Sequence, residues 1–263
     1  MEIRFYDKPG LSLAPAAQHA LRTALRRIAA TSLDPVPDYQ CLASAPSALD
    51  DKLIAVAYAG PPAARTPVAF TSAFFLPAAP ALAQPVLHTG LTVVDPAHRR
   101  RGVMTRLFGE IAARAFPTYA GEGGLWVTCL AEVPSSLGLV AWYLEDVFPA
   151  PEGAVRREEH GVIARAVSEG CREQMLIAPG AVLDEERFVF RGSNDWERGK
   201  CFKKDPEDER WRHRDEEWNT FFKETLKAGS GDEVLQVGFC SRERVDLILE
   251  VLGRQRSEIG AKL

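Results

Sequence analysis

Hydrophobic and polar residues follow one another along this chain in patterns that predict alternating strands and helices. Apolar side chains at every second position or in short runs indicate strands, and apolar side chains at three- and four-residue spacing indicate helices. In the first 150 residues the predicted strands are 3–5, 52–58, 68–76, 86–94 and 125–130, and the predicted helices are 16–30, 103–116 and 137–148. The strands 52–58 and 68–76 flank the Gly60-Pro61-Pro62 turn, which predicts a hairpin.

The pattern in the second half of the chain is less regular. It predicts helices at 158–175, 210–227 and 242–254, and strands around Phe188–Phe190 and at 234–240. The helix 210–227 is charged, and we expect its aromatic side chains to pack inward and its charged face to be solvated. No linker rich in Ser or Gly separates the two halves, which favours a single domain over residues 1–263. A second small domain that begins near residue 151 is the alternative.

The most informative stretch runs from Val86 to Phe116. Its apolar, β-branched residues predict a buried strand up to Val94, Asp95-Pro96 ends that strand, and a helix follows Gly102. Unpaired backbone N–H groups and the positive end of the dipole make the start of a helix attractive to anions. The arginines at 99–101 add positive charge suited to phosphates. The stretch therefore predicts a diphosphate-binding turn, and an ordinary solvated arginine-rich turn is the alternative.

These residues resemble the GNAT superfamily of acyl-CoA-dependent N-acyltransferases, whose motif is Arg or Gln, two residues, Gly, one residue, then Gly or Ala, preceded by Val-x-Pro. The motif stands here as Val94-Asp95-Pro96 and Arg99-Arg100-Arg101-Gly102-Val103-Met104, where Met104 departs from the usual small residue. The resemblance implies that acetyl-CoA or another acyl-CoA is the cosubstrate and that no metal takes part. The implied cofactor-binding residues are Val94, Arg99, Arg100, Arg101, Gly102, Val103, Met104 and Thr105.

The order of the predicted elements through residue 148 matches a GNAT core. The resemblance implies an α/β (α+β) fold with a mixed, mostly antiparallel central sheet that is splayed at the CoA site and flanked by helices. We expect a core over 1–148 and a C-terminal elaboration over 149–263 that carries a helical insertion. The superfamily closes its sheet with two antiparallel strands, for which Phe188–Phe190 and Leu235–Phe239 are the candidates.

Transfer of an acyl group from a thioester to an amine needs a base, a carbonyl-polarising donor and an acid. Counted back from Val-x-Pro, His88 falls where histone acetyltransferases of the superfamily place a glutamate base, and a histidine of near-neutral pKa suits proton removal. Tyr143 lies in Ala141–Phe148, which resembles the superfamily's Leu-Tyr-x-x-x-Gly-Phe signature with Val147 replacing Gly. The resemblance makes Tyr143 the acid that protonates the CoA thiolate. The backbone N–H of Val94 is the expected polarising donor.

Each of these assignments has an alternative. His88 can equally be a core histidine hydrogen-bonded at the end of a strand, and Tyr143 can be a half-buried aromatic on an amphipathic helix. Glu132 and His160 are further candidates for the base, without a motif behind them. The bulkier Met104 and Val147 also allow a CoA-binding or catalytically silent protein, or a GNAT scaffold turned to another reaction on a biosynthetic intermediate.

Composition narrows the expected partners. The chain has 263 residues, 46% of them hydrophobic, and a formal net charge of −4, which argues against a general nucleic-acid binder. Its five cysteines are widely spaced and form no Cys-x-x-Cys pair, which favours a reducing compartment. The N-terminus lacks the apolar core of a signal peptide, and prolines interrupt the uncharged run 66–94 too often for a membrane helix. We expect a cytoplasmic enzyme that acts on a small-molecule amine, without membrane or nucleic acid, and leave a homodimer open.

Overall fold

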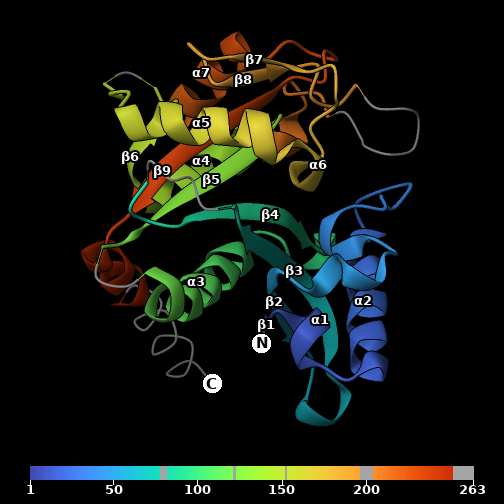
Figure 1. The fold of residues 1–263 in the computed structure, drawn as a ribbon. Helices are drawn as coiled ribbons and strands as arrows, with labels where there is room; N and C mark the ends of the chain where they lie inside the picture. The colour runs from blue at the N-terminus through green and yellow to red at the C-terminus, as the bar shows by residue number, and fades with distance from the viewer. Residues whose placement is uncertain (78–81, 121–122, 152, 196–203, 251–263) are drawn as a thin grey trace. The chain divides into compact units, whose positions relative to one another are not determined.

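The computed structural model describes residues 1–77, 82–120, 123–151, 153–195 and 204–250 (Figure 1). The chain divides into two compact units. The first consists of Met1–Phe74, Gly90–Gly124 and the stretch from Ser241, and the second consists of Phe75–Thr89 and Leu125–Cys240. The chain therefore passes from the second unit to the first within strand β4 (Val86–Val94), between Thr89 and Gly90. The boundary expected at residue 148 falls inside the second unit.

Antiparallel strands in the order β1-β2-β3-β4 form the sheet of the first unit. Besides β4, they are β1 (Glu2–Asp7), β2 (Lys52–Ala59) and β3 (Thr66–Phe75). The predicted hairpin is confirmed, because β2 pairs antiparallel with β3 across the Gly60 turn. The uncharged residues of β2 that predicted a strand are buried on both faces of the sheet, as expected for a strand covered on both sides.

Two helices cover opposite faces of this sheet (Figure 1). The predicted helix 16–30 is α2 (Pro15–Ala29), whose apolar side, with Leu25 and Ile28, packs on Ile54, Val56 and Phe70 of the sheet. The helix after the arginines is α3 (Val103–Ala115), which contacts β1 and β2. The remaining helical segments of this unit are α1 (Pro9–Ser12), the 3-10 turns η1 (Gln40–Leu42), η2 (Pro46–Leu49), η3 (Pro62–Ala64) and η4 (Pro96–His98), and the π-helical turn η5 (Phe116–Ala120).

The sheet of the second unit follows the order β4-β5-β9-β8-β7, with β6 paired to β9 off this path. Its strands are β5 (Leu125–Ala131), β6 (Glu145–Phe148), β7 (Val182–Asp184), β8 (Val189–Arg191) and β9 (Glu233–Cys240). The pairing of β4 with β5 is parallel and the other pairings are antiparallel, so the predicted mixed, mostly antiparallel sheet is confirmed. The two predicted closing strands are β8 and β9, which pair with each other.

The parallel pairing of β4 with β5 is short. It joins Val86–Thr89 to Trp126–Cys129, although β4 continues to Val94 and β5 to Ala131. The paired residues of β4 belong to the second unit, and Gly90–Val94 belong to the first.

The helices of the second unit are α4 (Pro134–Tyr143), α5 (Glu158–Gly170), α6 (Arg172–Met175) and α7 (Glu216–Thr225), with a 3-10 turn η6 (Glu209–Trp211). His160 of α5 lies 5.4 Å from the ring of Trp126, which places α5 on that face of β5. Gly238 of β9 points to the opposite face, where it meets Leu144 at the end of α4. α7 packs on α4, so helices cover both faces of this sheet as well.

Several predicted boundaries were wrong. The helix expected at 137–148 ends at Tyr143, and β6 replaces its last residues. The helix expected at 210–227 is divided into η6 and α7, because the side chain of Asp215 accepts the N–H of Glu217 and starts a new helix there. Residues 242–250 are helical as predicted, and the rest of that helix to Arg254 lies outside the described residues. Residues 78–81 and 121–122 also lie outside them.

Candidate active site

The turn before α3, in the first unit, carries the predicted anion site. Gly102 precedes the helix with φ +66, a left-handed conformation that L side chains rarely adopt, and a Cβ there would meet nothing within 4 Å. The glycine is therefore needed for its backbone conformation, with open space beside it. Gly102 is the N-cap residue and has no side chain that could accept the first N–H groups of the helix. The first turn of α3 also contains no acidic residue, so no carboxylate of that turn competes with a bound anion.

The three arginines of the turn are used differently. Arg99 donates from Nε to the carbonyl oxygen of Val94 at 3.2 Å and from Nη2 to Ser32 Oγ at 2.8 Å. It thus ties the turn to the end of β4 and to the region that follows α2. Arg100, with φ +61, and Arg101 are exposed. Arg99 is exposed as well, so all three arginines present their charge to solvent, and Arg99 also donates hydrogen bonds to the neighbouring segments.

The residues around the turn differ in how deeply they are buried. Val103 is buried, Met104 and Thr105 are half-buried on the first turn of α3, and Val94 is buried at the end of β4. The N–H of Asp95 donates to Val68 of β3 at 2.9 Å. Because successive N–H groups of a strand point to opposite edges, the N–H of Val94 points away from β3. The structure therefore brings Val94 and the whole predicted cofactor set together within one unit.

His88 lies in the second unit, in the paired part of β4. It is 2% exposed, stands opposite Thr128 of β5, and its Nδ1 is hydrogen-bonded to Thr128 Oγ1 at 3.0 Å. This hydrogen bond fixes the orientation of the imidazole ring. The geometry fits a core histidine, and it equally fits a base that a neighbouring hydroxyl orients.

Tyr143 also lies in the second unit, half-buried at the C-terminal end of α4. The next residues turn into β6, where Val147 occupies the position of the signature glycine. The missing space is supplied from the opposite strand: a Cβ at Gly238 would lie 3.1 Å from Val147 Cγ2 and 2.8 Å from Leu144 Cδ1. The bulkier Val147 is thus accommodated without displacing the end of α4.

Glu132, a further candidate for the base, belongs to a polar cluster at the end of β5, made of the buried Glu132, Ser193 and Asn194 and the half-buried Lys204 and Glu233. Glu132 accepts the backbone N–H of Lys204 at 2.6 Å and Asn194 Nδ2 at 3.3 Å, and Ser193 Oγ donates to Glu233 Oε2 at 2.6 Å. Burial, reinforced by Glu233 and partly offset by Lys204, raises the pKa of Glu132 to about 8. Glu132 therefore keeps its proton well above the usual range of a carboxyl group.

His160, the other candidate, is a helix cap. Its Nδ1 accepts the backbone N–H of Arg157 at 2.9 Å, so the ring hydrogen is on Nε2, which donates to the carbonyl of Asp146 at 2.7 Å. Burial lowers its pKa and favours this neutral form. With both nitrogens engaged by backbone groups, His160 stabilises the start of α5 and is not suited to take a proton from a substrate.

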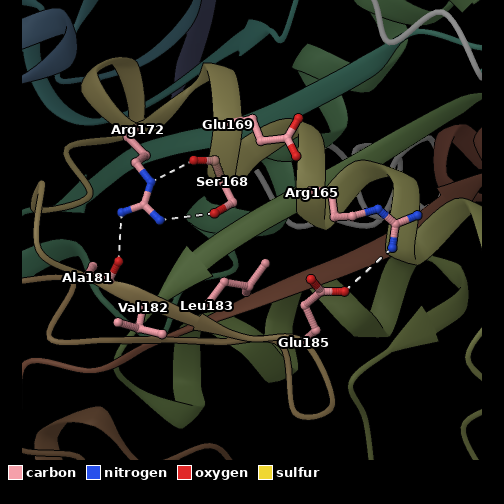
Figure 2. Close-up of a pocket in the computed structure, with 8 residues that line it drawn as sticks. All are labelled: Arg165, Ser168, Glu169, Arg172, Ala181, Val182, Leu183 and Glu185. Carbon is pink, nitrogen blue, oxygen red and sulfur yellow. Dashed lines mark hydrogen bonds and ion pairs between the residues drawn. The ribbon is translucent and has the colours of Figure 1, made fainter.

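A pocket of about 360 Å³ lies between α5 and β7 in the second unit (Figure 2). Arg172 donates to the carbonyl of Ala181 at 2.8 Å and to Ser168 Oγ at 3.0 Å, and Arg165 pairs with Glu185 at 3.5 Å. Three of its charged groups, those of Arg165, Arg172 and Glu185, are thus bonded to one another, to a hydroxyl or to backbone. None of the sequence-predicted site residues lines it.

Sequence reasoning missed two groups of residues. The partners of Glu132 are 61 or more positions away in sequence, and the only signal was a charged residue, Glu233, at the head of an apolar strand. Gln40 lies between the predicted helix 16–30 and the predicted strand 52–58, and no sequence pattern indicates a role for it. Among the described residues no group of three or more His, Cys, Asp or Glu could hold a metal ion, and Cys41, Cys129, Cys171 and Cys240 are buried. Within the same part of the chain, no helix has the length and apolar character needed to cross a membrane.

No protein-family model and no curated protein sequence matches the chain. Among solved structures, an acetyltransferase from Vibrio fischeri matches 49% of this chain and 94% of its own at 14% identity and a TM-score of 0.33. An aminoglycoside 6'-N-acetyltransferase complexed with coenzyme A matches 50% and 62% of the two chains at 16% identity and 0.31. Tetrahymena GCN5 matches 60% and 91% at 10% identity and 0.37. At these values the likeness carries no argument, and the function has to be argued from the residues above.

Proposed function

We propose that this chain is an acyl-CoA-dependent N-acyltransferase that transfers an acyl group, in the simplest case acetyl, directly to a small-molecule amine. The observation that carries the proposal is the turn at Gly102. It offers the open start of a thirteen-residue helix, a left-handed glycine with free space beside it, and three exposed arginines. These features together suit the diphosphate of CoA.

The proposed chemistry needs no covalent intermediate on the protein. We assign the removal of the amine proton to His88, with Thr128 holding Nδ1 and Nε2 taking the proton. We assign polarisation of the thioester carbonyl to the N–H of Val94, which points away from β3. We assign the protonation of the departing thiolate to the phenolic O–H of Tyr143.

The proposal is tested with Gly102→Asp, which places a carboxylate where the diphosphate would lie. The matched control is Gly229→Asp, because Gly229 also has a left-handed φ, of +69, and nothing within 4 Å of its Cβ position. We expect the wild type and the control to bind CoA equally in calorimetry and to release free thiol from acetyl-CoA with an amine from a panel. Gly102→Asp should retain its fold by circular dichroism and lose CoA binding by at least about a hundredfold, the loss of roughly two charge-assisted contacts. Unchanged CoA affinity in Gly102→Asp would remove the turn from the site.

A second function, a CoA-binding protein without transfer activity, is favoured by the burial of His88, which is only 2% exposed. In that case CoA should protect the wild type against thermal unfolding, while no amine elicits thiol release. Release of free thiol from acetyl-CoA with any acceptor amine, if it is lost in Gly102→Asp, would show that the protein is a transferase.

A further inference from the structure

Strand β4 contains one extra residue relative to β3. Backbone hydrogen bonds join Leu76 N–H to Val86 and Asp95 N–H to Val68, each at 2.9 Å. Nine positions separate Val86 from Asp95 along β4, whereas eight separate Val68 from Leu76 along β3. In a regular antiparallel ladder the two counts are equal. The extra residue forms a β-bulge in β4.

The bulge lies at Leu91, whose two main-chain groups are both bonded to side chains. Its N–H donates to Gln40 Oε1 at 2.8 Å, and its carbonyl oxygen accepts Ser72 Oγ at 3.3 Å. Thr71 of β3 and Thr92 of β4, the next position along the two strands, are hydrogen-bonded through their hydroxyls at 2.6 Å. Side-chain pairing between the strands is therefore present directly beyond Leu91. The amide of Gln40 therefore satisfies the N–H that the bulge takes out of the ladder.

Gln40 is held firmly for this contact. It is 8% exposed, its Nε2 donates to the hydroxyl of Tyr39, and its φ of +47 is a left-handed conformation uncommon for a residue other than glycine. A Cβ at Gly90 would collide with Gln40 Oε1 and lie 2.9 Å from Ser72 Oγ. A glycine in the strand, a strained backbone and a buried amide thus meet at one point, and local strain of this kind is typical of functional positions.

The bulge decides which edge of β4 the following N–H groups face. With the extra residue in place, the N–H of Asp95 faces β3 and that of Val94 faces the opposite edge. If β4 paired regularly through Leu91, the alternation would shift by one residue and Val94 would direct its N–H to β3. The N–H of Val94 would then be hydrogen-bonded within the sheet and could not donate to the thioester carbonyl.

We infer that Gln40 is a positioning residue for acyl transfer, which holds the amide of Leu91 and thereby fixes the bulge that directs the Val94 N–H away from β3. The inference rests on the proposed function, because it concerns the donor that this function uses. Gln40 need not touch either substrate.

The test compares Gln40→Met, which keeps the length of the side chain and removes the acceptor, with Gln40→Glu, which retains an oxygen acceptor. The control is Gln18→Met, in the same unit, since Gln18 Nε2 donates to the carbonyls of Gly10 and Leu13 at 2.8 and 2.9 Å. If Gln40→Met does not fold, Gly90→Ala serves instead, because its methyl group pushes the Gln40 amide away from Leu91.

Two readouts are used on the full chain: steady-state kinetics together with the Kd for CoA, and amide hydrogen exchange of Leu91 in protein labelled with ¹⁵N-leucine. In Gln40→Met we expect kcat to fall at least about tenfold, towards the hundredfold typical of a lost oxyanion donor, with the Kd for CoA unchanged. Leu91 should exchange at least about tenfold faster, since its N–H loses its acceptor. In Gln40→Glu, kcat and the exchange rate of the Leu91 amide should both stay close to the wild-type values. Gln18→Met should lower the Tm without lowering kcat.

The outcomes separate the inference from the proposed function. If the wild type turns over and Gln40→Met retains its kcat, the inference is overturned and the transferase assignment stands. Unchanged exchange of Leu91 in Gln40→Met also overturns it, because the contact would then not hold the bulge. A wild type that neither binds CoA nor releases thiol overturns the proposed function itself.

Discussion

Replacing Glu132 by Gln should change how the stability of the protein depends on pH. The glutamine has the shape of the protonated carboxyl group, and its single oxygen can still accept the N–H of Lys204, while its NH2 group replaces the oxygen that faces Asn194. In the wild type, burial and Glu233 raise the pKa of Glu132 to about 8. The folded state therefore binds this proton more tightly than the unfolded chain does.

The sign follows from that difference. The stabilising effect of the bound proton is complete below the ordinary pKa of 4.5 and is lost as the pH rises through about 8. At about 1.4 kcal/mol for each pH unit between these values, the free energy of unfolding falls by up to about 5 kcal/mol. Because the glutamine side chain does not titrate, the Glu132→Gln variant should escape this loss and become relatively more stable as the pH rises.

Urea unfolding at pH 5, 6, 7, 8 and 9 measures the effect. We expect the difference in unfolding free energy between Glu132→Gln and the wild type to grow by a few kcal/mol over this range, equivalent to about 10 °C in Tm for a domain of this size. Glu169→Gln, at an exposed position of α5, is the control and should run parallel to the wild type at every pH. Parallel curves for Glu132→Gln as well would refute the reasoning, since Glu132 would then have an ordinary pKa in the folded protein.

Two further predictions concern the proposed catalytic pair and the packing of α4. His88→Gln and Tyr143→Phe should each lower turnover about a hundred- to ten-thousandfold, the latter with little change in CoA affinity, as steady-state kinetics would measure. If both keep turnover within a few-fold of the wild type, neither carries the proton transfer. Gly138→Ala should lower the unfolding free energy by about 1–3 kcal/mol, because its Cβ would lie 2.8 Å from His213 Cδ2. Gly170→Ala, with nothing within 4 Å, is its control and should show no such loss in thermal unfolding.

The central strand, turn and helix could be predicted from sequence because several signals agree there. The apolar run, Asp95-Pro96, Gly102 and the helical spacing of 103–115 each indicate the same boundaries, and the structure has them within a residue or so. The end of α4 could not be predicted in this way. Leu144, Val147 and Phe148 continue the helical spacing, whereas the extended backbone of Leu144, the positive φ of Asp146 and the pairing of β6 with β9 show that the helix has ended.

The candidate site was predictable where a motif is local in sequence and not where it depends on tertiary contacts. The turn residues 99–105 are adjacent along the chain, so their proximity follows from the sequence itself. Gln40 and Leu91 are 51 positions apart, and nothing in the composition around Gln40 indicates that its amide reaches a strand. The polar cluster around Glu132 was not predicted for the same reason, because four segments that are separate in sequence supply it.

The glycine opposite β6 has a consequence for the sequences of relatives. In this chain the close approach of the two strands is made possible by Gly238 on β9, while the position at 147, where the resemblance would place glycine, carries valine. A methyl group at 238 would meet Leu144 Cβ at 2.9 Å as well as Val147, so shrinking residue 147 alone does not release the constraint. In an alignment of relatives that keep β6, position 238 should therefore be conserved as glycine, whereas position 147 should vary. A sequence signature that requires glycine at the position of Val147 would not match such relatives, and one that requires glycine at position 238 would match them.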